Sequence, residues 1–156
     1  MKRTRELELI DRKILTILQR DASVSHAELA ERVGASSASC WRRIKALEAD
    51  GVLLAAVRLA DAHKLDRGVN VLCNVRVANQ VQASSVAFEA FVREHPEIVE
   101  CYSMSGDWDY LLRVVVRDVA DYNAFLTGKM LKHPAVASAS SNFALETIKF
   151  TTAVPL

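Results

Sequence analysis

The period of the hydrophobic pattern changes near residue 60, and this change limits the possible folds more than any other feature of the chain. Before it, apolar residues recur at helical spacing, as in Leu7, Ile10, Ile14, Ile17 and Leu18. From residue 69 the stretch "VNVLCNVRV" alternates strictly, which is typical of a strand with one buried face. The chain is therefore predicted to be an α+β protein with a helical N-terminal part and a sheet-containing C-terminal part.

Three helices are predicted in the N-terminal part. After the first, "RDASVS" breaks the pattern, and Ser25 can cap a short helix "HAELAERV" that has Glu28 at the capping-box position. Gly34 ends this helix, because glycine enters the left-handed conformation at low cost. A third helix follows, with Ser36 or Ser37 as its cap and Gly51 as its stop. Helix, short glycine turn and helix is the pattern of a helix-turn-helix, whose second helix enters the DNA major groove.

The third helix, within "SSASCWRRIKALEADG" (residues 36–51), is predicted to have one buried side and one cationic side. Cys40, Ile44 and Leu47 share one side, and at roughly 100° per residue Arg42 lies about 200° from Cys40. Arg42 can offer a bidentate fork to guanine, while small neighbours allow close approach to the bases. The predicted DNA-contacting residues are Ser36, Ser37, Ala38, Ser39, Arg42, Arg43 and Lys45.

Charge supports this placement, although an ordinary solvated helix face is the alternative. Residues 1–60 carry 11 Lys and Arg against 8 Asp and Glu, whereas residues 61–156 carry 9 against 11. A polyanion such as DNA should therefore meet the N-terminal part, where Arg43 and the terminal Lys2, Arg3 and Arg5 can neutralise phosphates.

The C-terminal part reads as two βαβ units. The strand at residues 69–77 precedes a helix from about Ser84 to Glu94, and "EIVECYSMS" and "YLLRVVV" flank the turn "GDWD" as a hairpin. A helix from Asp118 to about Leu131 and a last strand after "KHPAVASASS" complete the pattern. The stretches "FVREHPEIVECY" and "KMLKHPAVASAS" echo one another, which indicates one unit used twice. The prediction is a ferredoxin-like βαββαβ domain with an antiparallel sheet.

No catalytic or metal site is predicted. Three cysteines, an odd number, are widely spaced among apolar neighbours, which fits packed thiols better than disulfides or metal ligands. His95 and His133 each precede a proline at a helix end and lack a partner at metal spacing. An enzyme would need an activated nucleophile, and although Cys101 is close in sequence to His95 and Asp107, nothing in the pattern activates it.

Membrane insertion is not expected either. No apolar run approaches the roughly 20 residues that span a bilayer, and no apolar signal segment follows the basic N-terminus. We therefore expect a cytoplasmic protein without a membrane partner.

Two segments resemble the leucine-responsive and asparagine-responsive regulators, the Lrp/AsnC or feast/famine family. "LIDRKILTILQRDASVSHAELAERVGASSASCWRRIKALEADGVL" resembles the DNA-binding domain of that family, and "SGDWDYLLRV" resembles its sensor-domain signature. Both occur in the family's order and at its separation. One departure is "SSAS" in the turn before the third helix, where many members have proline.

The resemblance implies a transcriptional regulator of amino-acid metabolism that binds double-stranded DNA and needs no cofactor. Residues 1–52 would form the DNA-binding domain, residues 53–66 a linking strand and hinge, and residues 67–156 the sensing and oligomerisation domain. Family members form homodimers, which assemble into octamers or larger particles. Here the linking strand would be "LLAAVRLA", residues 53–60.

The resemblance also implies an amino-acid effector bound between sensor domains, near Ser105, Gly106, Asp107, Trp108 and Asp109. Backbone amides of a tight turn can hold a carboxylate, and Asp109 could receive an ammonium group. The alternative is an ordinary hairpin turn whose aspartates bond their own backbone. "SSNFALETIKFTTAVPL" resembles the branch that regulates branched-chain keto-acid dehydrogenase operons and cysteine detoxification, so a branched-chain, other small hydrophobic or sulfur-containing amino acid is the expected effector. A sensor or scaffold without specific DNA binding is the alternative function.

Overall fold

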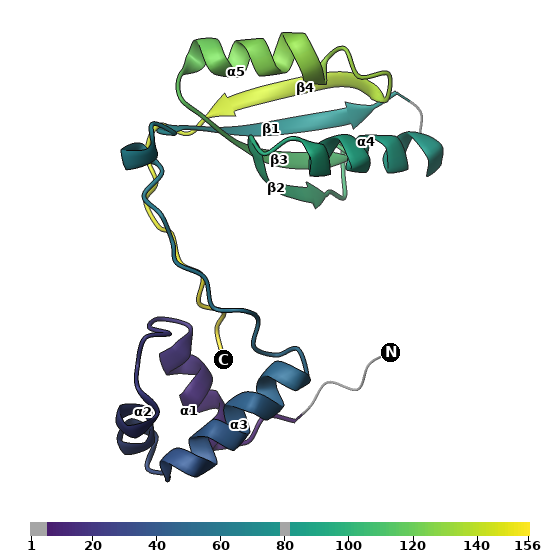
Figure 1. Cartoon of the computed structure of the whole chain (residues 1–156). Helices are drawn as coiled ribbons and strands as arrows, with labels where there is room; N and C mark the ends of the chain where they lie inside the picture. Colours follow the sequence, from purple (N-terminus) through teal and green to yellow (C-terminus); the bar gives the residue numbers. More distant parts are fainter. Residues whose placement is uncertain (1–5, 79–81) are drawn as a thin grey trace. The chain divides into compact units, whose positions relative to one another are not determined.

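The computed structural model describes residues 6–78 and 82–156, which divide into two compact units (Figure 1). The first unit runs to Leu59 and also includes Lys149–Leu156, and the second comprises Ala60–Ile148. The C-terminal tail, residues 149–156, therefore groups with the helical unit. The family resemblance had implied that residues 67–156, and so this tail, belong to the sensing domain. The side chain of Gln19 holds this tail, because its Oε1 accepts from Val154 N–H at 2.6 Å and its Nε2 donates to Val154 O at 3.2 Å.

The first unit contains the three expected helices, α1 (Leu9–Leu18), α2 (His26–Val33) and α3 (Ser37–Ala49). The hydroxyl of Ser25 accepts from Glu28 N–H at 3.2 Å, and Gly34 ends α2 with φ of 72° in the left-handed region. Of the two candidate caps of α3, Ser36 is the one used, since its hydroxyl accepts from Ser39 N–H at 3.2 Å. These signals are local, which is why the sequence shows them.

The core of the first unit joins one side of each helix. Ile14, Leu29, Cys40 and Leu47 are fully buried in it. Ile44 was predicted to be buried with them. It does pack against this core, but it is only half-buried. Cys40 and Leu47 are separated by nearly two whole turns and point the same way, whereas Ile44 is rotated to one side of them.

The second unit is a four-stranded antiparallel sheet with helices on one face. Its strands are β1 (Val69–Val77), β2 (Ile98–Ser103), β3 (Tyr110–Val116) and β4 (Val136–Phe143), in the order β2-β3-β1-β4. The helices are α4 (Gln82–Glu94) and α5 (Val119–Phe125), and a short 3-10 helix, η1 (His63–Leu65), precedes β1. This arrangement confirms the predicted ferredoxin-like fold.

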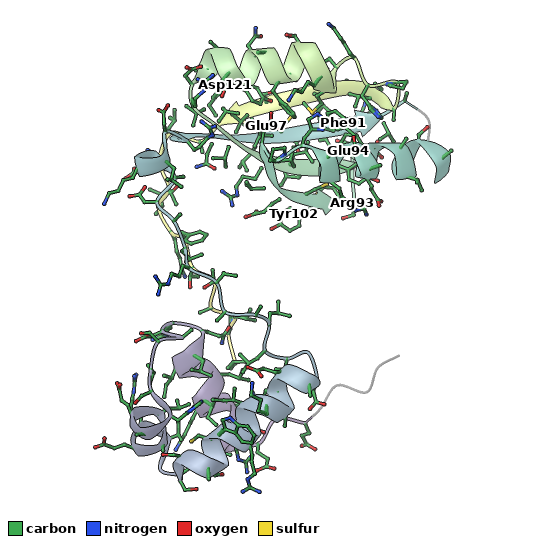
Figure 2. The ribbon with its side chains drawn as sticks, viewed as in Figure 1. Phe91, Arg93, Glu94, Glu97, Tyr102 and Asp121 are labelled. Carbon is green, nitrogen blue, oxygen red and sulfur yellow. The ribbon has the colours of Figure 1, made fainter. Side chains whose placement is uncertain are left out.

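Both helices pack on the same face of the sheet. Phe88 and Phe91 of α4 and Phe125 of α5 belong to one buried cluster with alternate residues of β1, namely Val71, Cys73, Val75 and Val77. The alternate residues of β1 on the opposite face are exposed or half-buried. Leu72 remains 40% exposed there, and Tyr102 of β2 is 52% exposed and points away from α5 (Figure 2).

Two elements differ from the sequence prediction. The helix expected to continue to Leu131 becomes a π-helical turn, η2 (Leu126–Met130), in which Leu131 N–H donates to Leu126 O at 2.9 Å. The last strand begins at Val136, inside the stretch after which it was expected, because Val136 already pairs with Val77 of β1. Strand pairing across the sheet fixes the residue at which β4 begins, and this residue lies just after the His-Pro pair through which the stretch was expected to enter a strand.

Candidate functional site

The outer side of α3 is small and open at its N-terminal end. Ser36, Ser37 and Ala38 are exposed and Ser39 is half-buried. Their short side chains leave the backbone of the first turn accessible, where the unpaired N–H groups and the positive end of the helix dipole favour an anion. The hydroxyl of Ser36 already accepts a hydrogen bond from Ser39 N–H, because Ser36 caps the helix.

Arg42 and Arg43 are adjacent in sequence and differ sharply in surroundings. Arg42 is exposed and has no hydrogen-bond partner among the residues that the structure describes. Arg43 donates from Nη1 to Asp11 Oδ1 at 2.9 Å and from Nη2 to Glu8 Oε2 at 2.8 Å. These carboxylates raise the pKa of Arg43, with the hydrogen bond to Asp11 as the largest cause. Arg42 is thus available to a partner, whereas Arg43 ties α3 to the start of α1.

Sequence reasoning had assigned Arg43 to phosphates and had missed the carboxylates that hold it. Asp11 is fully buried, although it is charged. A signal for this was present, because Asp11 lies at helical spacing from Leu7 and Ile14, on the apolar side of α1. A buried carboxylate needs a charged partner, and the partner here is 32 residues away in the chain.

Lys45 lies on the same exposed side of α3 as Arg42. Its Nζ is 2.7 Å from Glu48 Oε2, and both side chains are largely exposed, at 55% and 44%. Exposed ion pairs of this kind contribute little to stability, so the amine of Lys45 can leave Glu48 for another anion at little cost. The amine therefore remains able to reach a phosphate.

The loop between β2 and β3, residues 104–109, brings together the second predicted set of residues. Ser105, Gly106 and Asp107 are exposed, and Trp108 and Asp109 are half-buried. Gly106 has φ of 123°, and no atom lies within 4 Å of the position of an added Cβ. The glycine is therefore required by the backbone conformation rather than by space.

Asp109 fastens the loop to the end of β1. One carboxylate oxygen, Oδ2, accepts from Val77 N–H at 2.8 Å, and Asp109 N–H donates to Val75 O at 3.1 Å. Asp109 O in turn accepts from Met104 N–H at 2.9 Å, which closes the loop. The sequence analysis predicted that the carboxylate of Asp109 receives the ammonium group of an effector. In the structure its Oδ2 already accepts from Val77 N–H, so Oδ1 is the oxygen considered for that role.

Arg76 of β1 also holds this loop, and sequence reasoning had not singled it out. Its Nε and Nη2 both donate to Asp107 O, at 3.0 and 2.6 Å, and its guanidinium carbon lies 5.1 Å from the centre of the Trp108 ring. The only signal in the sequence is that Arg76 stands on the polar side of the alternating strand, near its end.

The groups considered for catalysis or metal binding are engaged locally. Burial, followed by the charge of Glu89, raises the pKa of the Cys101 thiol. The Nδ1 of His95 lies 2.7 Å from Phe91 O, and the Nδ1 of His133 accepts from Ala135 N–H at 3.2 Å. Across residues 6–78 and 82–156, no three His, Cys, Asp or Glu side chains gather as metal ligands. Within the same residues, every helix is too short or too polar to cross a membrane.

Comparison with known domains assigns a family to each unit. Residues 7–53 match winged helix-turn-helix DNA-binding domains, and residues 70–154 match the Lrp/AsnC ligand binding domain. The first match covers all three helices of the helical unit, and the second covers the sheet except for the first residue of β1.

Several whole proteins are similar to this chain over nearly its full length. The glutamate uptake regulatory protein of Zymomonas mobilis is 40% identical over 97% of this chain and 92% of its own length. The DNA-binding transcriptional activator DecR of Escherichia coli is 36% identical over 96% and 99%. A transcriptional regulator from Neisseria meningitidis, solved in complex with L-methionine, superposes with a TM-score of 0.93 at 33% identity over 96% of this chain and 97% of that one. The chain therefore belongs to the Lrp/AsnC family of transcriptional regulators.

Proposed function

We propose that this protein binds specific DNA sequences through α3 and that a small amino acid, bound at the β2–β3 loop, modulates this binding. The observation that carries the DNA-binding assignment is the exposed Arg42, whose guanidinium has no partner among the described residues and stands on the side of α3 opposite its buried residues. An arginine so placed can donate two hydrogen bonds to guanine in the major groove. Residues 1–52 would form the DNA-binding domain.

The neighbouring residues have different proposed roles. Ser36, Ser37, Ala38 and Ser39 would approach the sugar-phosphate backbone and the base edges at the start of α3, and Lys45 would reach a phosphate. Arg43 would act mainly by fixing the angle of α3, since Asp11 and Glu8 already hold its guanidinium.

The proposed effector site is formed by Ser105, Gly106, Asp107, Trp108 and Asp109. Gly106 and Asp107 are exposed residues, and backbone N–H groups of this turn could bind the carboxylate of an amino acid, while the Oδ1 of Asp109 could accept from its ammonium group. A branched-chain, other small hydrophobic or sulfur-containing side chain is favoured. The L-methionine bound by the related Neisseria protein supports this class.

We further propose that the protein is a homodimer that assembles into octamers or larger particles. Apolar residues of the linking segment are strongly exposed in the single chain, with Leu54 at 83%, Val57 at 76% and Leu59 at 65%. Their burial against a second copy would be favourable by about 25 cal/mol for each Å². Residues 53–66 would be the linking strand and hinge, and residues 67–156 the sensing domain.

The proposal is tested by selection of DNA fragments from the whole genome, followed by sequencing, and by calorimetric titration with each of the twenty amino acids. We expect a defined set of DNA sites and submillimolar binding of at least one amino acid. Gly106→Val should abolish amino-acid binding without loss of DNA binding, because a branched side chain is excluded from φ of 123°. Fragments retained without sequence preference would refute the DNA assignment.

A sensor or scaffold without specific DNA binding is the second candidate, and the exposure of Arg42, which has no partner within residues 6–78 and 82–156, argues against it. We propose no catalytic activity; the thiol of Cys101, the nucleophile considered above, is half-buried, and this burial raises its pKa and disfavours the thiolate. A regulator of this kind would act in the cytoplasm, where the chromosome lies.

A further inference from the structure

Arg76 lies where β1, one of the two inner strands of the sheet, loses its regular pairing. β1 pairs with β3 only as far as Val75, opposite Tyr110, and its register with β4 shifts between Arg76 and Val77. Shifts of this kind re-aim side chains and are common beside functional sites. The side chain of Arg76 is exposed, and it turns toward the β2–β3 loop.

Two donors of Arg76 hold one backbone carbonyl of that loop. Nε and Nη2 both reach Asp107 O, and the same guanidinium lies over the Trp108 ring. Hydrogen bonds from a charged donor are stronger than those from a neutral one, and a cation over the face of an indole ring is attracted to it. One side chain therefore restrains two successive residues of the proposed effector site.

The restraint fixes the direction of a neighbouring donor. A peptide unit is planar and trans, so its C=O and N–H point in opposite directions. With Asp107 O held toward Arg76, the N–H of Trp108 points away from Arg76. That N–H has no partner within the described part of the chain, so it can donate to a ligand.

We propose that Arg76 is a positioning residue for the amino-acid effector: by holding Asp107 O and the Trp108 ring, it aims the Trp108 N–H at the effector's carboxylate. This inference rests on the proposed effector site. A pre-set donor binds more tightly because the loop loses little freedom on binding. Lysine should not replace Arg76, since its ammonium group lacks the two coplanar N–H donors, Nε and Nη2, that both reach Asp107 O.

The test compares Arg76→Ala and Arg76→Lys with Arg93→Ala, a matched loss of an exposed arginine that lies on α4 and pairs with Glu89 (Figure 2). Each of the twenty amino acids is first titrated calorimetrically into the wild type, and the tightest is then titrated into the variants. In parallel, acrylamide quenching is measured in a Trp41→Phe background, where Trp108 is the only tryptophan.

Both Arg76 variants should bind the amino acid at least about tenfold more weakly and expose Trp108 to quencher, while Arg93→Ala changes neither quantity. Operator binding and the thermal midpoint should remain near those of the wild type, which separates positioning from general destabilisation. Unchanged amino-acid affinity in Arg76→Ala, with a wild type that binds, would overturn the role of Arg76 alone. A wild type that binds no amino acid would overturn the effector site itself, and the role of Arg76 with it.

Discussion

At the scale of single residues, the two neighbouring arginines of α3 have different surroundings. Arg42 is exposed to solvent, whereas Arg43 donates a hydrogen bond to the fully buried Asp11. The sequence predicted the exposure of Arg42, because the helical period places it opposite Cys40 and Leu47. It did not predict the role of Arg43, because that role depends on a carboxylate from another helix.

Arg42→Ala should weaken specific DNA binding by about 1–3 kcal/mol and leave stability unchanged, because it removes a base-reading group from an exposed position. The measurement is an operator binding isotherm at fixed salt. Arg93→Ala, an exposed arginine of the second unit, is the control. An Arg42→Ala protein with wild-type affinity would show that another residue reads the bases.

Arg43→Ala should instead lower the free energy of unfolding of the helical unit by about 3 kcal/mol, because it leaves the buried Asp11 without this charged partner. Arg43→Lys should lose less, since it keeps the charge but not the two-branched contact. Urea denaturation followed by circular dichroism measures both. Equal stability of Arg43→Ala and the wild type would mean that the ion pair is dispensable.

The cysteines should react slowly with thiol reagents in the folded protein. Burial raises the pKa of both Cys73 and Cys101, so each forms its reactive thiolate less readily than an exposed cysteine does. Ellman's reagent at pH 7.5 should modify the native thiols far more slowly than those in urea, and the native rate should rise with pH. A fast-reacting thiol at neutral pH would contradict the assignment of these cysteines as packed residues.

At the scale of elements, local signals were predictable and long-range pairing was not. Ser25, Gly34 and the alternation of β1 are visible in a few consecutive residues, and the structure confirms each one. The start of β4 at Val136, the π-helical turn before Leu131 and the bonds from Arg76 to the β2–β3 loop depend on neighbours distant in sequence. For that reason the sequence identified the loop but not the arginine that holds it.

Leu47→Ala should destabilise the helical unit by about 2–5 kcal/mol, because Leu47 is fully buried between the helices. Ile44→Ala should cost roughly half as much, since Ile44 is half-buried at the edge of the same core. Denaturant unfolding of the two variants gives this comparison directly. A larger loss for Ile44→Ala would mean that the inner side of α3 has been assigned wrongly.

At the scale of the whole molecule, the described part of the single chain leaves apolar side chains exposed, and the proposed assembly would cover some of them. The linking segment exposes Leu54, Val57 and Leu59, and the second face of the sheet exposes Leu72 and Tyr102. The sequence suggested assembly only through the family resemblance, because alternation within one strand cannot say what covers its outer face.

Leu54→Asp combined with Val57→Asp should convert the protein to a monomer in sedimentation velocity, because two charges would have to enter a dimer interface. Operator affinity should then fall by roughly 100-fold, because one DNA-binding domain loses the avidity of two. Asn123→Asp with Ala124→Asp adds equal charge at exposed positions of α5 and is the control. A variant that stays dimeric would place the interface elsewhere.

The central claim, that an amino acid controls DNA binding in this protein, is tested most directly by operator titration of the wild type with and without its tightest-binding amino acid, at fixed salt. Coupling between two sites in regulators is about 1–3 kcal/mol, so the operator Kd should change by roughly 5–150-fold. The amino-acid Kd should change by the same factor when operator is present. Two superimposable operator isotherms, from a protein that binds both partners, would contradict the account.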